Sequence, residues 1–139
     1  IVAQLKDHAP AIRLSSWDVT INKVLNKCRI FVCDHLSTTY LEALAANVPT
    51  VLFWDSNNNI FKDEAKPYFN LLRDNGILYD NPEDASAAIS RIYDDVETWW
   101  NAPSRQNAIE EFCMVFARTE PHALGLWSRE LRMKNSRDS

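Results

Sequence analysis

The chain has 139 residues, of which 46% are hydrophobic and 24% are charged, and its formal net charge is -4 at pH 7. This length and apolar content suit one compact domain that buries a sizeable core. The acidic balance, with a pI of about 5.3, argues against a nucleic-acid partner, because nucleic-acid-binding domains carry a basic stripe.

The cysteine residues indicate a reducing compartment, and the histidine residues do not predict a metal centre. Cys28, Cys33 and Cys113 cannot all pair, and none has the Cys-x-x-Cys spacing of a metal or redox site. His8 and His122 are isolated, so we expect no metal. The longest apolar run, residues 48–54, is far shorter than the ~20 residues of a membrane span. We therefore expect a cytoplasmic protein, at most associated with the inner face of a membrane.

Short apolar runs rich in β-formers alternate with amphipathic segments along the chain. We predict strands over residues 29–33, 50–54 and 77–79, with 11–14 as a possible fourth. We predict helices over residues 18–28, 38–46, 67–75, 82–96, 104–117 and 121–133.

Several helix ends are marked by single residues. Ser37 stands where a helix N-cap is needed, and Asn81 followed by Pro82 is a second start signal. Asn47 follows the first of these helices and can take the left-handed conformation that often ends one.

Strand-helix alternation with continuously apolar strands predicts an α/β fold, a Rossmann-like parallel sheet of three or four strands with helices on both faces, ending in two or three helices. The chain starts at Ile1 inside what reads as an element. We therefore interpret residues 1–139 as one domain, the C-terminal half of a larger protein whose N-terminal half precedes it.

Ligands of open α/β sheets bind beyond the carboxyl ends of the strands. This rule selects residues 34–39, residues 55–62 and the turn near Asp80. The first segment runs from a strand directly into a helix N-terminus, where unpaired N–H groups and the helix dipole attract a diphosphate. The hydroxyl groups of Ser37, Thr38 and Thr39 add donors there.

Glu42 lies four residues after Thr38, so both side chains share a helix face. Its carboxylate can accept two hydrogen bonds from a ribose diol, although an exposed glutamate with good helix propensity explains it equally well. His35 is a candidate for donating a proton to a phosphate or a leaving oxygen, with a structural hydrogen bond as the alternative. Asp55 opens a polar loop that either closes over the donor or is plain surface.

The segment from Asp34 to Val51, Asp-His-Leu-Ser-Thr-Thr-Tyr-Leu-Glu-Ala-Leu-Ala-Ala-Asn-Val-Pro-Thr-Val, resembles the donor site of GT-B glycosyltransferases. These enzymes show an acid, seven residues, then Glu-Ala-Leu/Met-Ala and a Gly-x-Pro turn. The resemblance implies that Glu42 holds the nucleotide ribose and that Asp34 faces the transferred sugar. Here Asp34 replaces the commoner Glu, and Asn47 replaces Gly.

Residues 63–73 and 112–119, together with 34–51, are similar to transferases of bacterial O-antigen and surface-carbohydrate gene clusters. This resemblance implies a glycosyltransferase that moves a sugar from a nucleotide-sugar, used as substrate and not as cofactor, to a carbohydrate or lipid-linked acceptor bound by the N-terminal half. The serine and threonine residues after Asp34 are also similar to those of polyol-phosphate transferases that use CDP-glycerol. A non-catalytic interaction domain of the same fold is the third alternative.

Overall fold

The computed structural model describes residues 7–16, 18–55 and 61–118. Its elements follow in the order α2 (Ile21–Leu25), β1 (Phe31–Cys33), α3 (Thr38–Ala45), β2 (Thr50–Phe53), α4 (Lys66–Asp74), β3 (Leu78–Tyr79), α5 (Pro82–Ile92), a 3-10 turn η1 (Tyr93–Asp95), α6 (Val96–Trp100) and α7 (Pro103–Phe116). In these ranges no helix is both long and apolar enough to cross a bilayer.

The three strands form a parallel sheet in the order β1-β2-β3. Cys33 pairs with Leu52, and Leu52 in turn pairs with Leu78, so the three strands are aligned in register. The predicted α/β fold is thus confirmed. The possible fourth strand over residues 11–14 is wrong, because this segment is irregular and makes no ladder with the sheet. Its side chains are poorly covered, and Leu14 is 53% exposed.

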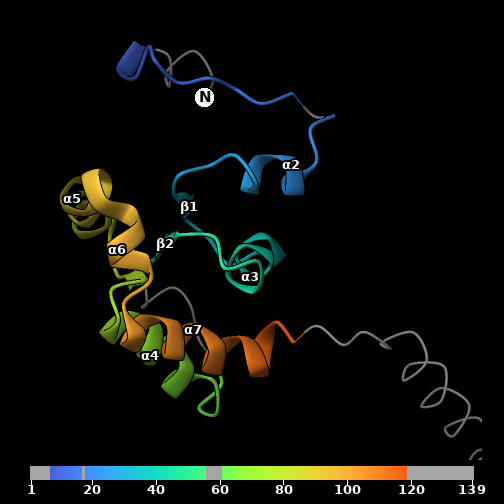
Figure 1. Cartoon of the computed structure of the whole chain (residues 1–139), viewed down its shortest axis with the longest axis vertical. Helices are drawn as coiled ribbons and strands as arrows, with labels where there is room; N and C mark the ends of the chain where they lie inside the picture. Colours follow the sequence, from blue (N-terminus) through green and yellow to red (C-terminus); the bar gives the residue numbers. More distant parts are fainter. Residues whose placement is uncertain (1–6, 17, 56–60, 119–139) are drawn as a thin grey trace, which may run out of the picture.

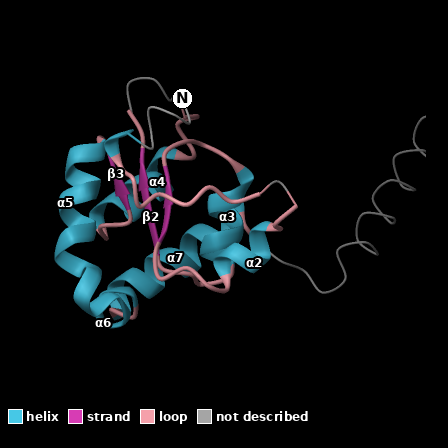
Figure 2. Cartoon of the chain, turned by 90° about the horizontal axis from the view of Figure 1, so that it is seen from above, coloured by secondary structure: helices cyan, strands magenta, loops and turns pink. Residues whose placement is uncertain are grey.

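Helices cover both faces of the sheet (Figure 1). Helix α5 contacts β2 and β3 from one side, whereas α3 and α7 lie on the other side, as Figure 2 shows. Helix α4 packs along α7. The short helix α6 joins the two layers, since it follows α5 and leads into α7. The architecture is therefore Rossmann-like, with three layers.

The core on the α7 side is rich in aromatic residues. Phe112 is fully buried, and its ring lies 5.4 Å from that of Phe69 and 6.5 Å from that of Tyr40. Trp54 follows β2 and contacts Tyr40 and Phe69. Because these residues come from α3, α4, α7 and the position directly after β2, the aromatic cluster ties the carboxyl end of the sheet to three helices.

The helix predicted over residues 82–96 is interrupted. Asp95 has φ -138° and ψ 61°, outside the helical region, and its carboxylate accepts a hydrogen bond from the Thr98 N–H at 3.2 Å. It therefore caps a new helix, α6, where the apolar spacing had indicated continuity. Tyr93, which lies within the range predicted as one helix, is 53% exposed. The helix predicted over 121–133 lies outside the described residues.

Two turns use left-handed backbone. Asn47 has φ 53° directly after α3, as predicted, and Gly76 has φ 68° after α4. Their N–H groups bond back to the carbonyls of Leu44 and Arg73, which closes each helix before the next strand.

Candidate functional site

The register of the sheet brings the three predicted ligand segments to one edge. Because Cys33 is level with Leu52, and Phe53 is level with Tyr79, residues 34, 54 and 80 all follow at the carboxyl ends of neighbouring strands. Parallel strands lie about 4.8 Å apart, so the loops that leave them adjoin. The predicted location of the site at this edge thus has the required topology.

Cys33 orders the loop between β1 and α3. Its thiol is buried, donates a hydrogen bond to the carbonyl of His35 at 3.2 Å, and lies 3.8 Å from Oγ of Ser37. The loop is thereby drawn back over the end of its own strand. In the sequence, the spacing of Cys33 bears only on metal and redox chemistry, so its role in ordering this loop was not predicted. The sequence signal for this role was its position at the end of a predicted strand, four residues before the predicted N-cap Ser37.

Asp34 and His35 form a pair on the surface of this loop. Oδ1 of Asp34 lies 2.7 Å from Nδ1 of His35, and the two side chains are 68% and 69% exposed. The hydrogen bond from His35 holds the pKa of the Asp34 carboxyl below its usual value. With Nδ1 engaged by the carboxylate, Nε2 is the imidazole nitrogen that can meet a ligand.

Ser37 occupies the N-cap position of α3 but does not cap it. Its backbone is extended, with φ -141° and ψ 168°, and its hydroxyl makes no capping hydrogen bond. The first turn of α3 also contains no acidic side chain. The N–H groups and positive dipole end of this helix are therefore left for another acceptor.

The remaining predicted residues of α3 follow its helical geometry. Thr38 is exposed and Thr39 is half-buried, while Glu42 is exposed. Since α3 spans Thr38–Ala45 without interruption, Glu42 lies one turn after Thr38 on the same face. A diphosphate at the helix end and a ribose beside Glu42 would be compatible with this arrangement.

Asp55 is exposed just after Trp54, on the loop that leaves β2. Most of the loop predicted to close over the donor, residues 56–60, lies outside the described residues. The described part of this loop brings Asp55 to the carboxyl edge of the sheet.

A buried indole lies at the same edge. Trp54 is 4% exposed, and its Nε1–H has no hydrogen-bond acceptor among the residues that the structure describes. Its ring lies 5.7 Å from that of Tyr40, whose pKa burial raises to about 12. In the sequence, Trp54 is only the last residue of a predicted strand, and a single aromatic residue there gives no further signal.

Two basic side chains of α4, Lys66 and Arg73, are engaged by carboxylates. Nζ of Lys66 lies 2.6 Å from Asp63, and Nε of Arg73 lies 2.9 Å from Asp80. Arg73 also donates to Asn70 at 2.8 Å. Any phosphate contact by these two side chains would compete with existing pairs.

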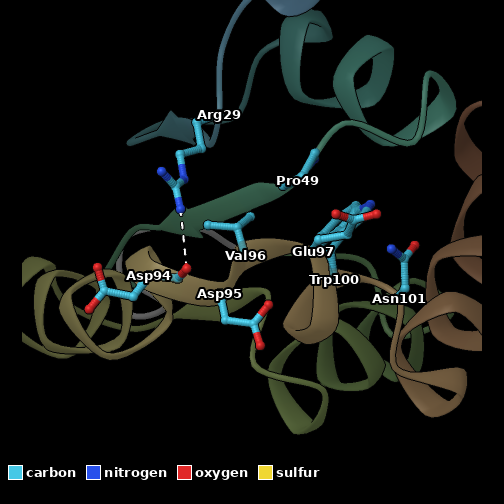
Figure 3. A pocket seen from close by; sticks show the side chains of 8 residues that line it. All are labelled: Arg29, Pro49, Asp94, Asp95, Val96, Glu97, Trp100 and Asn101. Carbon is cyan, nitrogen blue, oxygen red and sulfur yellow. Dashed lines mark hydrogen bonds between the residues drawn. The ribbon is translucent and has the colours of Figure 1, made fainter.

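A cavity of about 400 Å³ lies at the opposite edge of the sheet, where Arg29 precedes β1 and Pro49 precedes β2 (Figure 3). Asp94, Asp95 and Glu97 line it, and the guanidinium of Arg29 turns toward the carbonyl of Asp94 at 3.4 Å. Three carboxylates make this cavity unfavourable for a nucleoside diphosphate. The carboxyl edge therefore remains the candidate site.

Within the described ranges, no three His, Cys, Asp or Glu side chains gather in a way that could hold a metal ion. Neither a curated protein nor a solved structure matches the chain. The sequence model described as LIC12162 family transferase matches residues 1–131, and the chain therefore belongs to this family of transferases.

Proposed function

We propose that this chain binds the nucleotide-sugar donor of a glycosyltransferase at the junction between β1 and α3. The observation that carries the proposal is the N-terminus of α3, which sits at the carboxyl edge of the sheet with an N-cap hydroxyl that makes no capping bond. Such a helix end is complementary to a diphosphate. Membership of a transferase family supports a donor group as the ligand.

Each residue of the site then has a distinct role. The backbone N–H groups of α3, with the hydroxyls of Ser37, Thr38 and Thr39, hold the phosphates, and Glu42 accepts hydrogen bonds from the ribose hydroxyls. Asp34 and His35 lie on the loop beside the phosphates, where they face the sugar. Asp55 adds a polar contact from the next loop.

The reaction we propose is displacement at the anomeric carbon of the sugar. The acceptor hydroxyl gives its proton to solvent, and its oxygen forms the new bond to the anomeric carbon. The bond from this carbon to the nucleotide phosphate breaks, and the phosphate oxygen leaves with the bonding electrons. The α3 N–H groups stabilise the charge that develops on this leaving group. His35, oriented by Asp34, can supply a proton through Nε2. The acceptor, of the carbohydrate or lipid-linked type found on bacterial surfaces, is bound by another domain.

The same helix end also fits a CDP-polyol donor, because the phosphates and the ribose are common to both donor classes. The run of hydroxyl side chains after Asp34 favours this second candidate. In that reaction the acceptor attacks phosphorus instead of carbon, and CMP leaves.

Ligand-observed NMR with CMP, CDP, UDP, GDP, sugar nucleotides and CDP-glycerol tests the proposal. The unmodified chain should bind one nucleotide class, and Glu42→Ala should weaken that binding about fivefold or more, as expected for loss of a hydrogen bond to a charged group. Glu111→Ala is the matched control, since Glu111 is an exposed glutamate of α7.

The outcomes separate the candidates. Preference for a sugar nucleotide supports the glycosyltransferase, and preference for CDP-glycerol supports the polyol-phosphate transferase. Binding that is equally strong in both glutamate variants would place the ligand elsewhere. If no nucleotide binds the chain, the proposed donor site is not functional in this chain, and an association domain becomes the better description.

A further inference from the structure

Trp54 carries one polar group into an apolar cluster. Its side chain is buried, and its indole Nε1–H meets no acceptor in the described ranges. Buried polar groups of folded proteins almost always have a partner, because an unpaired donor loses its hydrogen bonds to water and gains none in return. An N–H group in this state indicates an acceptor that comes from elsewhere, such as a bound ligand.

The indole lies beside the first turn of α3. Trp54 directly follows β2, at the carboxyl edge of the sheet, and its ring lies 5.7 Å from that of Tyr40, the third residue of α3. Its other ring neighbour, Phe69, has an apolar side chain and lies 6.2 Å away. In the described structure, Ser37 makes no capping hydrogen bond to the same turn. Two independent kinds of donor, the helix N–H groups and the indole N–H, thus lie together at this edge.

We propose that Trp54 is a phosphate-binding residue, whose indole N–H donates to an oxygen of the diphosphate at the N-terminus of α3. The inference rests on the proposed function, which places a nucleoside diphosphate there, and it adds a contact from the end of the neighbouring strand. A phosphate oxygen is the best acceptor for this donor, because hydrogen bonds to a charged group are about twice as strong as neutral ones. Burial strengthens such a bond further.

Little packing opposes the approach of a phosphate to this place. Cys33 is level with Leu52 in the sheet, so residues 34–36 run alongside the position of Trp54. The side chains of residues 34–36 are all exposed. Because they bury little surface, they can shift at small cost when a ligand enters.

Neutral donors are also what this edge has to offer a phosphate. The two basic side chains of α4 are already engaged, Lys66 by Asp63 and Arg73 by Asp80. Contacts from N–H groups therefore have to hold the diphosphate, and preorganised N–H groups do so at helix ends without a cation. The indole N–H adds a donor that stays protonated at every pH at which the protein is folded.

Trp54→Phe tests the inference, with Trp100→Phe as the matched control. Trp100 is 3% exposed, like Trp54, but its indole N–H is bonded twice to Asn47. The probes are inorganic pyrophosphate and the nucleoside diphosphates CDP, UDP and GDP. Trp54→Phe should weaken pyrophosphate and the preferred nucleotide about tenfold each, as loss of a hydrogen bond to a charged group does. Trp100→Phe should leave both affinities unchanged.

Glu42→Ala separates the phosphate contact from the ribose contact. Its carboxylate is assigned to the ribose hydroxyls, so this variant should weaken the nucleotide but not pyrophosphate. Trp54→Phe should weaken both ligands. If Trp54→Phe weakens the nucleotide alone, the indole N–H serves another part of the donor, and the phosphate assignment is wrong.

The indole signals of the unmodified chain give a second readout that needs no variant to fold. The chain has five tryptophans, and proton–nitrogen NMR resolves each indole N–H once the signals are assigned. Pyrophosphate should move the Trp54 proton downfield and slow its exchange with solvent, because the proton enters a hydrogen bond to an anion. The Trp100 signal, already bonded to Asn47, should stay in place.

The outcomes distinguish this inference from the proposed function. A Trp54 signal that pyrophosphate leaves unmoved while it binds, or a Trp54→Phe variant with full affinity, would overturn the inference. The nucleotide site would then still stand if Glu42→Ala weakens nucleotide binding. A Trp54 signal that responds to pyrophosphate but to no nucleotide would support the phosphate contact and contradict the nucleotide donor. Failure of every probe to bind would overturn both.

Discussion

Trp100 donates its indole N–H to two acceptors on Asn47, the backbone carbonyl at 3.0 Å and Oδ1 at 2.9 Å. Trp100 is 3% exposed, and Asn47 holds the left-handed turn after α3 with φ 53°. One residue thus ends the helix that carries the candidate site and also anchors α6 beneath it. Glycine at this position would supply the conformation but not the second acceptor.

Asn47→Ala should therefore lower the free energy of unfolding by about 1–2 kcal/mol, because alanine pays the steric cost of the left-handed region. Asn47→Gly should have a smaller effect, since glycine takes this φ readily and the backbone acceptor for Trp100 remains. Urea unfolding of the two variants beside the unmodified chain measures the difference. Equal loss in both would mean that the Oδ1 contact, not the backbone conformation, carries the stabilisation.

The Asp34–His35 pair should make the stability of the protein depend on pH in the acidic range. The hydrogen bond from His35 lowers the pKa of Asp34 from its ordinary value of 3.8. Its contribution to stability is therefore present above that value and is lost as the pH falls through the lowered pKa. His35→Ala should return the Asp34 pKa toward 3.8. Carboxyl carbon NMR titration of both proteins measures this shift, and an identical Asp34 titration in the variant would show that the pair does not form in solution.

Most of the fold could be predicted from the sequence because the relevant signals are local. The runs before Cys33 and before Trp54 are too short for helices and are bounded by polar loops, and both became strands. The helix over 38–46 was fixed by its apolar spacing and by Asn47. These features depend on neighbouring residues alone, so they survive in the folded chain.

The break at Asp95 could not be predicted in the same way. Apolar spacing continues through Val96, and only the carboxylate bond to the Thr98 N–H ends one helix and starts the next. The candidate site, too, could be predicted only in part. The sequence order predicts Ser37 at the N-cap position of α3 and Glu42 within this helix, whereas the bond from Cys33 to the His35 carbonyl depends on the direction of a strand side chain and the path of a loop.

Tyr40 should make the stability of the protein depend on pH in the alkaline range. Burial, with a smaller contribution from Cys33, raises its pKa to about 12 from 10.0. The unfolded chain loses this proton at lower pH than the folded protein, so stability should fall as the pH rises from about 10 to 12. Tyr40→Phe should flatten that fall, leaving the part due to Tyr79, whose pKa is also raised by burial. Thermal unfolding across this pH range measures the slope, and an unchanged slope in the variant would contradict the assignment to Tyr40.

Ser37 and Asn81 both occupy N-cap positions, but only Asn81 makes the capping bond, from the Asp84 N–H to its Oδ1 at 2.8 Å. Asn81→Ala should therefore lower the free energy of unfolding by about 1 kcal/mol, as the loss of a working cap does. Ser37→Ala should change it by less than about 0.5 kcal/mol, below the usual effect of a cap.

If the hydroxyl of Ser37 serves the donor phosphates instead, the same variant should weaken nucleotide binding about fivefold, the equivalent of one hydrogen bond, and Asn81→Ala should not. Chemical unfolding measures the free energy of unfolding of each variant, and ligand-observed NMR measures its nucleotide affinity. A Ser37 variant that loses stability but keeps its nucleotide affinity would make Ser37 an ordinary helix cap and remove it from the proposed site.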